Sequence, residues 1–591
     1  MEISSLDYAI IFGFFTLVLV IGLIASKTSG KNTSEFFLSG RNMPWWLLGF
    51  SMVATTFSTD TPNLVTDIVR TDGVSGNWVW WAFLLTGLLT VFVYARLWRK
   101  SNVTTDIEFY ELRYSGKSAR FLRWFRAVYL GLAFNVLAMA GVTLAAIKIG
   151  QVMLGVSPIT IVAIAGTITV LFSTFGGFKG VIYTDFLLFI VAMIGAFGAA
   201  IYLINLPEVG GLEQLLSHPE VKGKLDLIPS FDDKDAFIAI LIIPLAVQWW
   251  SAWYPGAEPG GGGYVAQRML AAKDETHAIK ATFFFNIMHY ALRPWPWILV
   301  ALASLVLYPD VASIQQAFPQ VEASKLGNDL AYSAMLTKLP AGLLGIVLAS
   351  LGAAYMSTLS SHLNWGSSYI VNDFYKQQIN SNASEKQLVL VGRISTVLLM
   401  VLSSFFALQM QNAKQLFDII LMFGAGSGLI FILRWFWWRI NTWSEITAMV
   451  VSGVVSILIS FTAVGPALFG ADGFFDSWFQ FPFVVIVTTI AWLAVTFLTP
   501  AEDHEVLQEF VTKINPGGPG WKRFNAPSTE SWNVPKGIMA MLSGCVMVYA
   551  VLFSVGNFIY GKNVQGLILF VVALLSGYVL SRAWKQMQGL F

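Results

Sequence analysis

Residues 340–375 read PAGLLGIVLASLGAAYMSTLSSHLNWGSSYIVNDFY, and this stretch decides the fold. Its first half is apolar and long enough to enter a bilayer. In its second half, hydroxyl and amide side chains recur at offsets of 0, +3, +4, +7 and +11, so one helical face carries Ser357, Ser360, Ser361, Asn364 and Ser368. Thr358 lies beside this face, and the turn before it, Gly352-Ala353-Ala354, is sterically open.

Two interpretations of this polar face are open. Small polar residues allow two helices to approach closely and to hydrogen-bond across their contact. Six polar side chains within about three turns also suit a hard cation, which needs several oxygen ligands. The rest of the chain has to decide between a helix contact and an ion site.

The composition is that of a polytopic membrane protein. The 591 residues are 56% hydrophobic and 12% charged, with a mean hydropathy of +0.66, which is far too apolar for a soluble domain of this size. No basic run is interleaved with aromatic residues, so we expect no nucleic-acid partner. The single cysteine, Cys545, excludes an intrachain disulfide. The five histidines lack the paired spacing of a zinc site.

The first apolar run is expected to be a membrane span and not a signal peptide. Its flank carries Glu2 and Asp7, and Lys27 and Lys31 follow it, which predicts an N-terminus outside the membrane. About fifteen spans are expected from length and hydropathy, near residues 8–26, 44–69, 75–98, 121–154, 158–175, 180–205, 236–257, 279–307, 341–374, 387–410, 414–438, 443–464, 478–498, 536–560 and 564–584.

With the N-terminus outside, successive loops alternate between the inner and outer sides of the membrane, and the charged residues fit this alternation. Basic residues within 96–126, 268–280 and 376–393 fall in or beside predicted inner loops, as the positive-inside rule requires. The acidic loop 206–235 falls outside, whereas the segment 499–534 and the C-terminus fall inside. We therefore expect a multi-pass protein of the cell membrane with a cytoplasmic C-terminus.

Two of the spans are interrupted. The second contains STDTPN at 58–63, where proline removes a backbone donor and the polar side chains compete for backbone hydrogen bonds. The seventh contains WWSAWYPG at 249–256, followed by Pro259 and four glycines. Non-helical backbone survives at membrane depth only where it is buried in protein or lines a cavity. Interrupted spans at matching positions of two halves, here five spans apart, indicate a transporter binding site between inverted repeats.

Four motifs resemble the sodium:solute symporter family. AAYMSTLSS at 353–361 is similar to the family's eighth core helix, and SGR at 39–41 to the approach to its first. QRMLAAKD at 267–274 resembles the inner loop after the interrupted seventh span. FGG at 175–177, followed by YTD at 183–185, resembles the approach to the fifth core helix. As a set the motifs cover the chain from about residue 36 to about residue 440.

The resemblance implies an all-α, LeuT-like core of two inverted five-helix repeats with flanking helices. The corresponding division of the chain is an N-terminal extra helix and inner loop (1–43), a first repeat (44–205), an extracellular loop (206–235), a second repeat (236–440) and C-terminal accessory helices (441–591).

The resemblance also implies two sodium sites. The first would use the carbonyl oxygens of Ala54, Phe57 and Ala354 and the hydroxyls of Ser357 and Thr358. This set agrees with the break expected just after Phe57, because carbonyl ligands need unwound backbone.

The second sodium site would use an intramembrane carboxylate, Asp185, with Ser360 and Ser361. Such a carboxylate is costly unless it is paired. The alternative for Asp185 is therefore a salt bridge to Lys179 or to another base of the inner loops.

The solute is expected near the midplane, with the candidate lining residues Thr56, Thr61, Trp80, Trp249, Trp253, Tyr254 and His289. The tryptophans could instead form an aromatic belt or pack in the core, and His289 could be a satisfied core residue. Arg293 could pair with a substrate carboxylate or with Asp60.

The candidate solute-lining residues differ from those of the family's galactose carriers, in which a glutamine stands at the position of Thr61, a glutamate near that of Trp80 and a lysine near that of His289. Galactose as the solute is therefore in doubt.

The function expected is secondary active transport and not enzyme catalysis: symport of a small polar organic solute with Na+, with two ions and alternating access. The solute would be a sugar or polyol, or a small carboxylate or amino acid. The alternative is a proton-coupled symporter of the same fold with Asp185 as the proton carrier. The expected partners are the solute, sodium and the lipid bilayer, with no obligatory protein partner evident.

Overall fold

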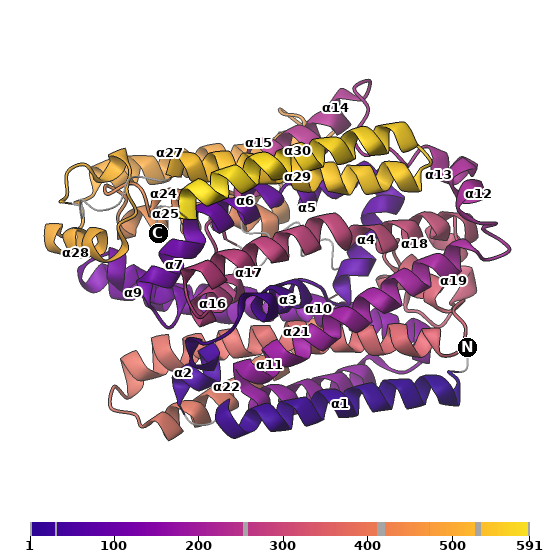
Figure 1. Ribbon diagram of the computed structural model, residues 1–591, viewed down its shortest axis with the longest axis horizontal. Coiled ribbons are helices and arrows are strands. Elements are labelled where there is room, and N and C mark those ends of the chain that lie inside the picture. The colour runs from indigo at the N-terminus through magenta and orange to yellow at the C-terminus, as the bar shows by residue number, and fades with distance from the viewer. Residues whose placement is uncertain are drawn as a thin grey trace.

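The computed structural model describes residues 3–29, 32–251, 258–410, 420–471, 473–525 and 534–588. Across these ranges the secondary structure is helical, apart from one isolated bridge between Met43 and Ala272. Long helices run side by side along the longest dimension of the molecule (Figure 1). Eleven of the described helices are long and apolar enough to cross a membrane. The expected all-α, polytopic class is confirmed.

The first part of the chain contains a peripheral helix, α1, and the first half of the expected core. Its helices are α1 (Ser5–Ser29), α2 (Thr33–Leu38), α3 (Trp45–Thr55), α4 (Asp60–Asp72), α5 (Trp78–Trp81), α6 (Leu84–Leu89), α7 (Ala95–Ser101), α8 (Phe109–Arg113), α9 (Gly116–Arg126), α10 (Asn135–Leu154) and α11 (Pro158–Ile204). Helix α11 contains the two spans expected at 158–175 and 180–205. Gly177 divides it with φ 55°, a conformation that favours glycine.

The remaining helices belong to a short loop (α12 and α13), to the second half of the expected core and to the accessory region. They comprise α12 (Leu212–Ser217), α13 (Pro219–Lys222), α14 (Lys234–Phe237), α15 (Ile243–Ala246), α16 (Gly263–Ala271), α17 (Glu275–Ile287), α18 (Pro294–Leu307), α19 (Val311–Ala317), α20 (Leu330–Leu336), α21 (Leu343–Tyr369), α22 (Glu385–Gln409), α24 (Gly428–Leu433), α25 (Thr442–Phe461), α26 (Val464–Phe469), α27 (Gln480–Leu498), α28 (His504–Ile514), α29 (Val534–Ile559) and α30 (Asn563–Gln588).

Both expected interruptions are confirmed. Helix α3 ends at Thr55 and α4 begins at Asp60, so four residues between them are not helical. In the seventh span, α15 ends at Ala246, the described residues 258–262 are not helical, and α16 begins at Gly263; residues 252–257 lie outside the described part of the chain. The count of fifteen spans stays a prediction, since the broken spans do not reach span length as single helices.

Helix α21, which contains most of the opening stretch, lies at the centre of the polar contacts. It packs against α11, α1, α22, α3 and α16. Its second half is buried, including every hydroxyl residue from Ser357 to Ser368. No lipid-facing helix could carry this face, because its polar atoms need partners.

The two ends of the bundle differ in charge. Helix α9, with its arginines, lies near one end, and α12 and α13 of the acidic loop 206–235 lie at the other (Figure 1). Helix α1 begins at the α12 end, and α30 finishes at the α9 end. This arrangement agrees with the alternation of charges expected from the sequence.

A buried ion network lies near the α9 end and joins distant parts of the chain. Arg126 of α9 pairs with Glu258, which also lies 3.9 Å from Arg434, and Arg434 pairs with Glu445 of α25 at 3.3 Å. Each of these four side chains is at most 3% exposed. The sequence predicts only that Arg126 lies in or beside an inner loop. The difference arises because a charge pattern does not reveal partners more than a hundred residues away.

Candidate functional site

The first predicted sodium site lies where α21 crosses the end of α3. The hydroxyl of Thr358 donates to the carbonyl oxygens of Thr55 at 3.1 Å and Phe57 at 3.0 Å. These carbonyls are free for side-chain donors because α3 has ended and its last oxygens lack helical partners. Two predicted ligands, Phe57 and Thr358, are therefore in contact. Ala54 and Ala354 are each 2% exposed, on the same two helices.

Ser357 turns away from these carbonyl oxygens. Its hydroxyl donates to Oδ1 of Asp185 at 2.5 Å. The predicted first site is thereby connected to the carboxylate of the predicted second site. Both side chains are buried, at 1% and 0% exposure.

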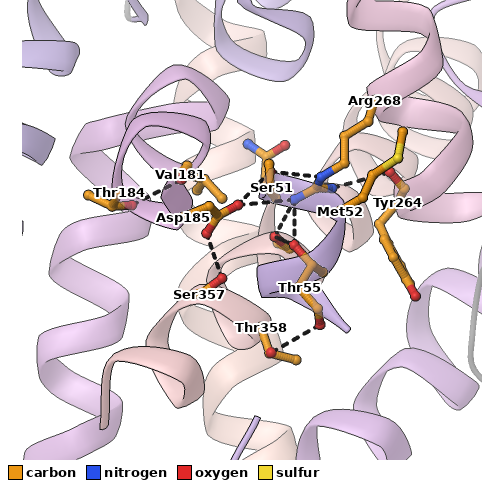
Figure 2. Close-up of polar contacts among 12 residues, drawn as sticks. Ser51, Met52, Thr55, Val181, Thr184, Asp185, Tyr264, Arg268, Ser357 and Thr358 are labelled. Carbon is orange, nitrogen blue, oxygen red and sulfur yellow. Dashed lines mark hydrogen bonds and ion pairs between the residues drawn. The ribbon is translucent and has the colours of Figure 1, made fainter. Parts of the chain in front are cut away.

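Asp185 is held from three helices (Figure 2). Besides Ser357 of α21, Ser51 of α3 donates to its Oδ2 at 2.5 Å, and a guanidinium nitrogen of Arg268 of α16 lies 3.5 Å from Oδ2. Arg268 and Asp185 are both 0% exposed. The salt bridge considered for Asp185 is thus present, although its partner is Arg268 and not Lys179.

The two serines predicted with Asp185 have different partners. Ser361 accepts from Arg268 at 2.7 Å and lies 3.0 Å from the hydroxyl of Thr55. Ser360 accepts from Ser173 of α11 at 2.8 Å. Ser361 therefore shares the guanidinium with Asp185, whereas Ser360 contacts α11.

Three polar residues at this centre were not among the predicted ligands: Ser51, Thr55 and Arg268. Ser51 and Thr55 are four residues apart on α3, so they share the face that meets α21. That spacing was readable in the sequence. Arg268 was assigned to an inner loop because arginine there satisfies the positive-inside rule.

A cavity lies beside the break between α3 and α4. It encloses about 60 Å³ and is lined by Thr55, Thr56, Ser58, Asp60, Thr61, Leu64, Val65, Trp80, His289 and Arg293. Four of the predicted solute residues, Thr56, Thr61, Trp80 and His289, are therefore in one place. Trp249 does not line this cavity and packs against Trp250, with ring centroids 5.5 Å apart. The predicted Trp253 and Tyr254 lie outside the described residues.

The cavity wall combines opposite charges with hydroxyl groups. Arg293 donates to the carbonyl oxygens of Val53 and Thr56 and to the Thr56 hydroxyl, each at 3.1 Å. The same hydroxyl lies 3.2 Å from Nδ1 of His289. Asp60 lines the cavity, and no ion pair in the described part of the chain joins it to Arg293. Arg293 therefore holds the unwound backbone, and Asp60 lines the same cavity.

Comparisons with known proteins agree on one family. The model of the sodium:solute symporter family matches residues 36–453. A sodium/glucose cotransporter 4 of Danio rerio is 28% identical over 507 residues, covering 79% of this chain and 73% of that protein. A sodium/glucose cotransporter of Vibrio parahaemolyticus is 24% identical and covers 78% and 86%. A human sodium/myo-inositol cotransporter is 26% identical and covers 86% and 75%.

The fold has a solved counterpart. A Na+-coupled sialic acid symporter, in a substrate-bound outward-open state, superposes with a TM-score of 0.66 at 20% identity. The match covers 85% of this chain and all of that one. The family model extends over more than half of the sequence and includes both broken spans, α11 and α21. The chain is a transporter and not an enzyme, and it belongs to the sodium:solute symporter family.

Proposed function

We propose that this symporter moves a small polyhydroxylated solute, a sugar or polyol, together with two sodium ions by alternating access. The contact that carries the proposal is Thr358 of α21 against the carbonyl oxygens at the end of α3. A hydroxyl and unwound carbonyls form the kind of oxygen set that coordinates Na+ in broken-helix transporters. The first ion would use Ala54, Phe57, Ala354, Ser357 and Thr358.

The second ion would use Asp185 with Ser361 and Ser360. A buried carboxylate supplies the negative charge that the first set lacks, and hydroxyl oxygens lie around it. Because Ser357 donates to Asp185, its hydroxyl would turn to the first ion as the second one reaches the carboxylate.

The number of ions sets how far the solute can be concentrated. One charge crossing about 100 mV releases about 2.3 kcal/mol, so two charges release about 4.6 kcal/mol. At about 1.4 kcal/mol per tenfold, two ions support roughly 2,000-fold accumulation from voltage alone, and one ion supports roughly 45-fold.

The cavity favours a hydroxyl-rich solute. Asp60 offers an acceptor, Ser58 offers a buried hydroxyl for which the described residues provide no partner, and the Trp80 ring offers an apolar face. Relatives named as glucose and myo-inositol cotransporters point to the same class. A small carboxylate or amino acid is the second candidate, because Arg293 is close enough to the cavity to meet an anion.

The size of the cavity supports alternating access. Its volume of about 60 Å³ has room for a few water molecules, which is too small for a monosaccharide. The elements that line it, which are α3, α4, α5 and the segment between α17 and α18, would have to separate before solute could enter. Broken helices at a midplane site are the usual place for such a movement.

The orientation in the cell membrane follows from the charges. We place the N-terminus outside and the C-terminus in the cytoplasm, which puts the arginines of α9 on the cytoplasmic side. The opposite positions of α9 and of α12 and α13, which belong to the acidic loop 206–235, support this assignment.

A thermal-shift screen of the purified protein tests the proposal. Sugars, polyols, amino acids and carboxylates are added in Na+ or in K+, since a ligand of the folded state raises its stability by mass action. The expected result is stabilisation by a sugar or polyol that requires Na+. Uptake that persists when sodium is replaced at fixed pH would contradict sodium coupling. If the same uptake then changes when the pH is changed, the proton is favoured as the coupling ion.

A further inference from the structure

We infer that Arg268 is a tethered cation, which holds the ligands of the second sodium site until Na+ displaces it. The inference rests on the proposed function, because it concerns the site built from Asp185 and Ser361. It makes Arg268 a positioning residue whose guanidinium and a sodium ion occupy that site in turn.

The contacts of Arg268 coincide with the predicted ligands. One guanidinium nitrogen, Nη2, donates to Ser361 and to Thr55 at 2.7 Å each and lies 3.5 Å from Oδ2 of Asp185. Its Nε donates to Ser51 at 2.9 Å, and Ser51 donates in turn to Asp185. Figure 2 shows the guanidinium among these groups.

The single negative charge of Asp185 favours an exchange of the Arg268 guanidinium for Na+ over the binding of both cations at once. Asp185 and Arg268 are both fully buried, and a buried carboxylate needs a cation. No other base of the described chain forms an ion pair with Asp185. A sodium ion that takes Oδ2 and the Ser361 hydroxyl leaves no acceptor for Nη2 except Thr55, and two cations would then face one carboxylate. One positive charge at the carboxylate therefore excludes the other.

The exchange would also link ion binding to helix movement. Arg268 is on α16, the second part of the seventh span, and its acceptors are on α3 and α21. Its departure removes three hydrogen bonds that tie α16 to these two helices and the ion pair that ties it to Asp185 of α11. Sodium at Asp185 would thus free one broken span from the other.

The competition lowers the apparent sodium affinity of the second site. When a binding-competent state is populated only in part, the measured dissociation constant rises by the inverse of that fraction. If the guanidinium is seated about nine times in ten, its removal strengthens sodium binding about tenfold.

The test compares wild-type protein with Arg268→Gln in detergent, with equilibrium ²²Na+ binding and sodium-dependent thermal stabilisation as readouts. The expected result is a second-site sodium affinity at least about tenfold higher and a loss of solute accumulation. An affinity equal to or weaker than that of wild type overturns the inference. Gln267→Ala is the matched control, since this neighbour on α16 donates to Phe37 and Asn364 and does not contact Asp185; its sodium affinity is expected to equal that of wild type.

Two further variants decide the matter if Arg268→Gln does not fold. Ser51→Ala and Thr55→Val each remove one acceptor of the guanidinium and leave Asp185 and Ser361 in place. Each is expected to raise sodium affinity by about two- to threefold, and no change in both overturns the inference. A wild-type protein that does not bind sodium contradicts the proposed function itself, whereas equal binding by wild type and variants contradicts only the role of Arg268.

Discussion

The two predicted sodium sites share Ser357 but differ in charge. The first is built from neutral oxygens, with Thr358 donating to Thr55 and Phe57. The second contains a carboxylate that already has a cation within 3.5 Å. A sodium ion can enter the first site by displacing hydrogen bonds alone, whereas entry to the second requires an exchange of charges. The difference predicts that the first site fills first and that the second site controls movement.

The largest effect is expected from removing both hydroxyls of the first site. Ser357→Ala with Thr358→Ala deletes two of five proposed ligands and the three hydrogen bonds that these hydroxyls donate to Asp185, Thr55 and Phe57. We expect sodium-driven accumulation in proteoliposomes to be abolished. Ser368→Ala is the matched control, because its hydroxyl donates within α21, to Trp365. Undiminished uphill uptake by the double variant would contradict the first site.

The next effect concerns the carboxylate. Asp185→Asn removes the charge of the second site and leaves Arg268 buried without its counter-ion, so either one sodium is lost or uptake is abolished. If one ion remains, the voltage-driven accumulation should fall from roughly 2,000-fold to roughly 45-fold. The measurement is the ratio of charge to solute flux. An unchanged ratio would contradict a second sodium at Asp185.

A smaller effect is expected in the cavity. Asp60→Asn keeps the shape of the side chain but weakens its hydrogen bonds to solute hydroxyls, which should raise the KM for solute about tenfold, or about 1.4 kcal/mol. The sodium affinity measured without solute should stay within about twofold. An unchanged KM would show that Asp60 does not contact the solute.

The smallest effect should come from Ser360. Its hydroxyl accepts from Ser173 and must rotate to reach an ion at Asp185, so Ser360→Ala should weaken sodium binding by about threefold, less than 1 kcal/mol. Equilibrium ²²Na+ binding measures the change. A loss as large as that of Asp185→Asn would mean that Ser360 is a principal ligand, and the contrast between the two sites would have to be redrawn.

The sequence was sufficient for the elements that local chemistry determines. Proline and clustered polar residues at 58–63 predicted the break between α3 and α4, and the spacing of hydroxyls predicted the buried face of α21. The four cavity residues Thr56, Thr61, Trp80 and His289 were predicted from their place near the midplane beside the broken spans, and the structure brings them together.

The pairing of charges could not be read in the same way. Arg268 and Asp185 are on different helices, and an arginine beside an apolar helix looks the same whether it faces water or a carboxylate. Arg293 illustrates the same limit, since its partners are backbone carbonyls exposed only because α3 ends. Such contacts depend on tertiary packing, which neither periodicity nor the positive-inside rule encodes.

One buried ion network bears on slippage, the passage of ions without solute. It consists of Arg126, Glu258, Arg434 and Glu445. Breaking one buried pair leaves an uncompensated charge at a cost of about 3–5 kcal/mol, while wetting the whole network hydrates all four groups together. A conformation in which the network at the α9 end is only partly separated therefore has a higher free energy than one in which it is fully paired or fully hydrated. If this end opens and closes in the proposed alternating access, we expect the transporter to move between two well-defined conformations and rarely to carry ions without solute.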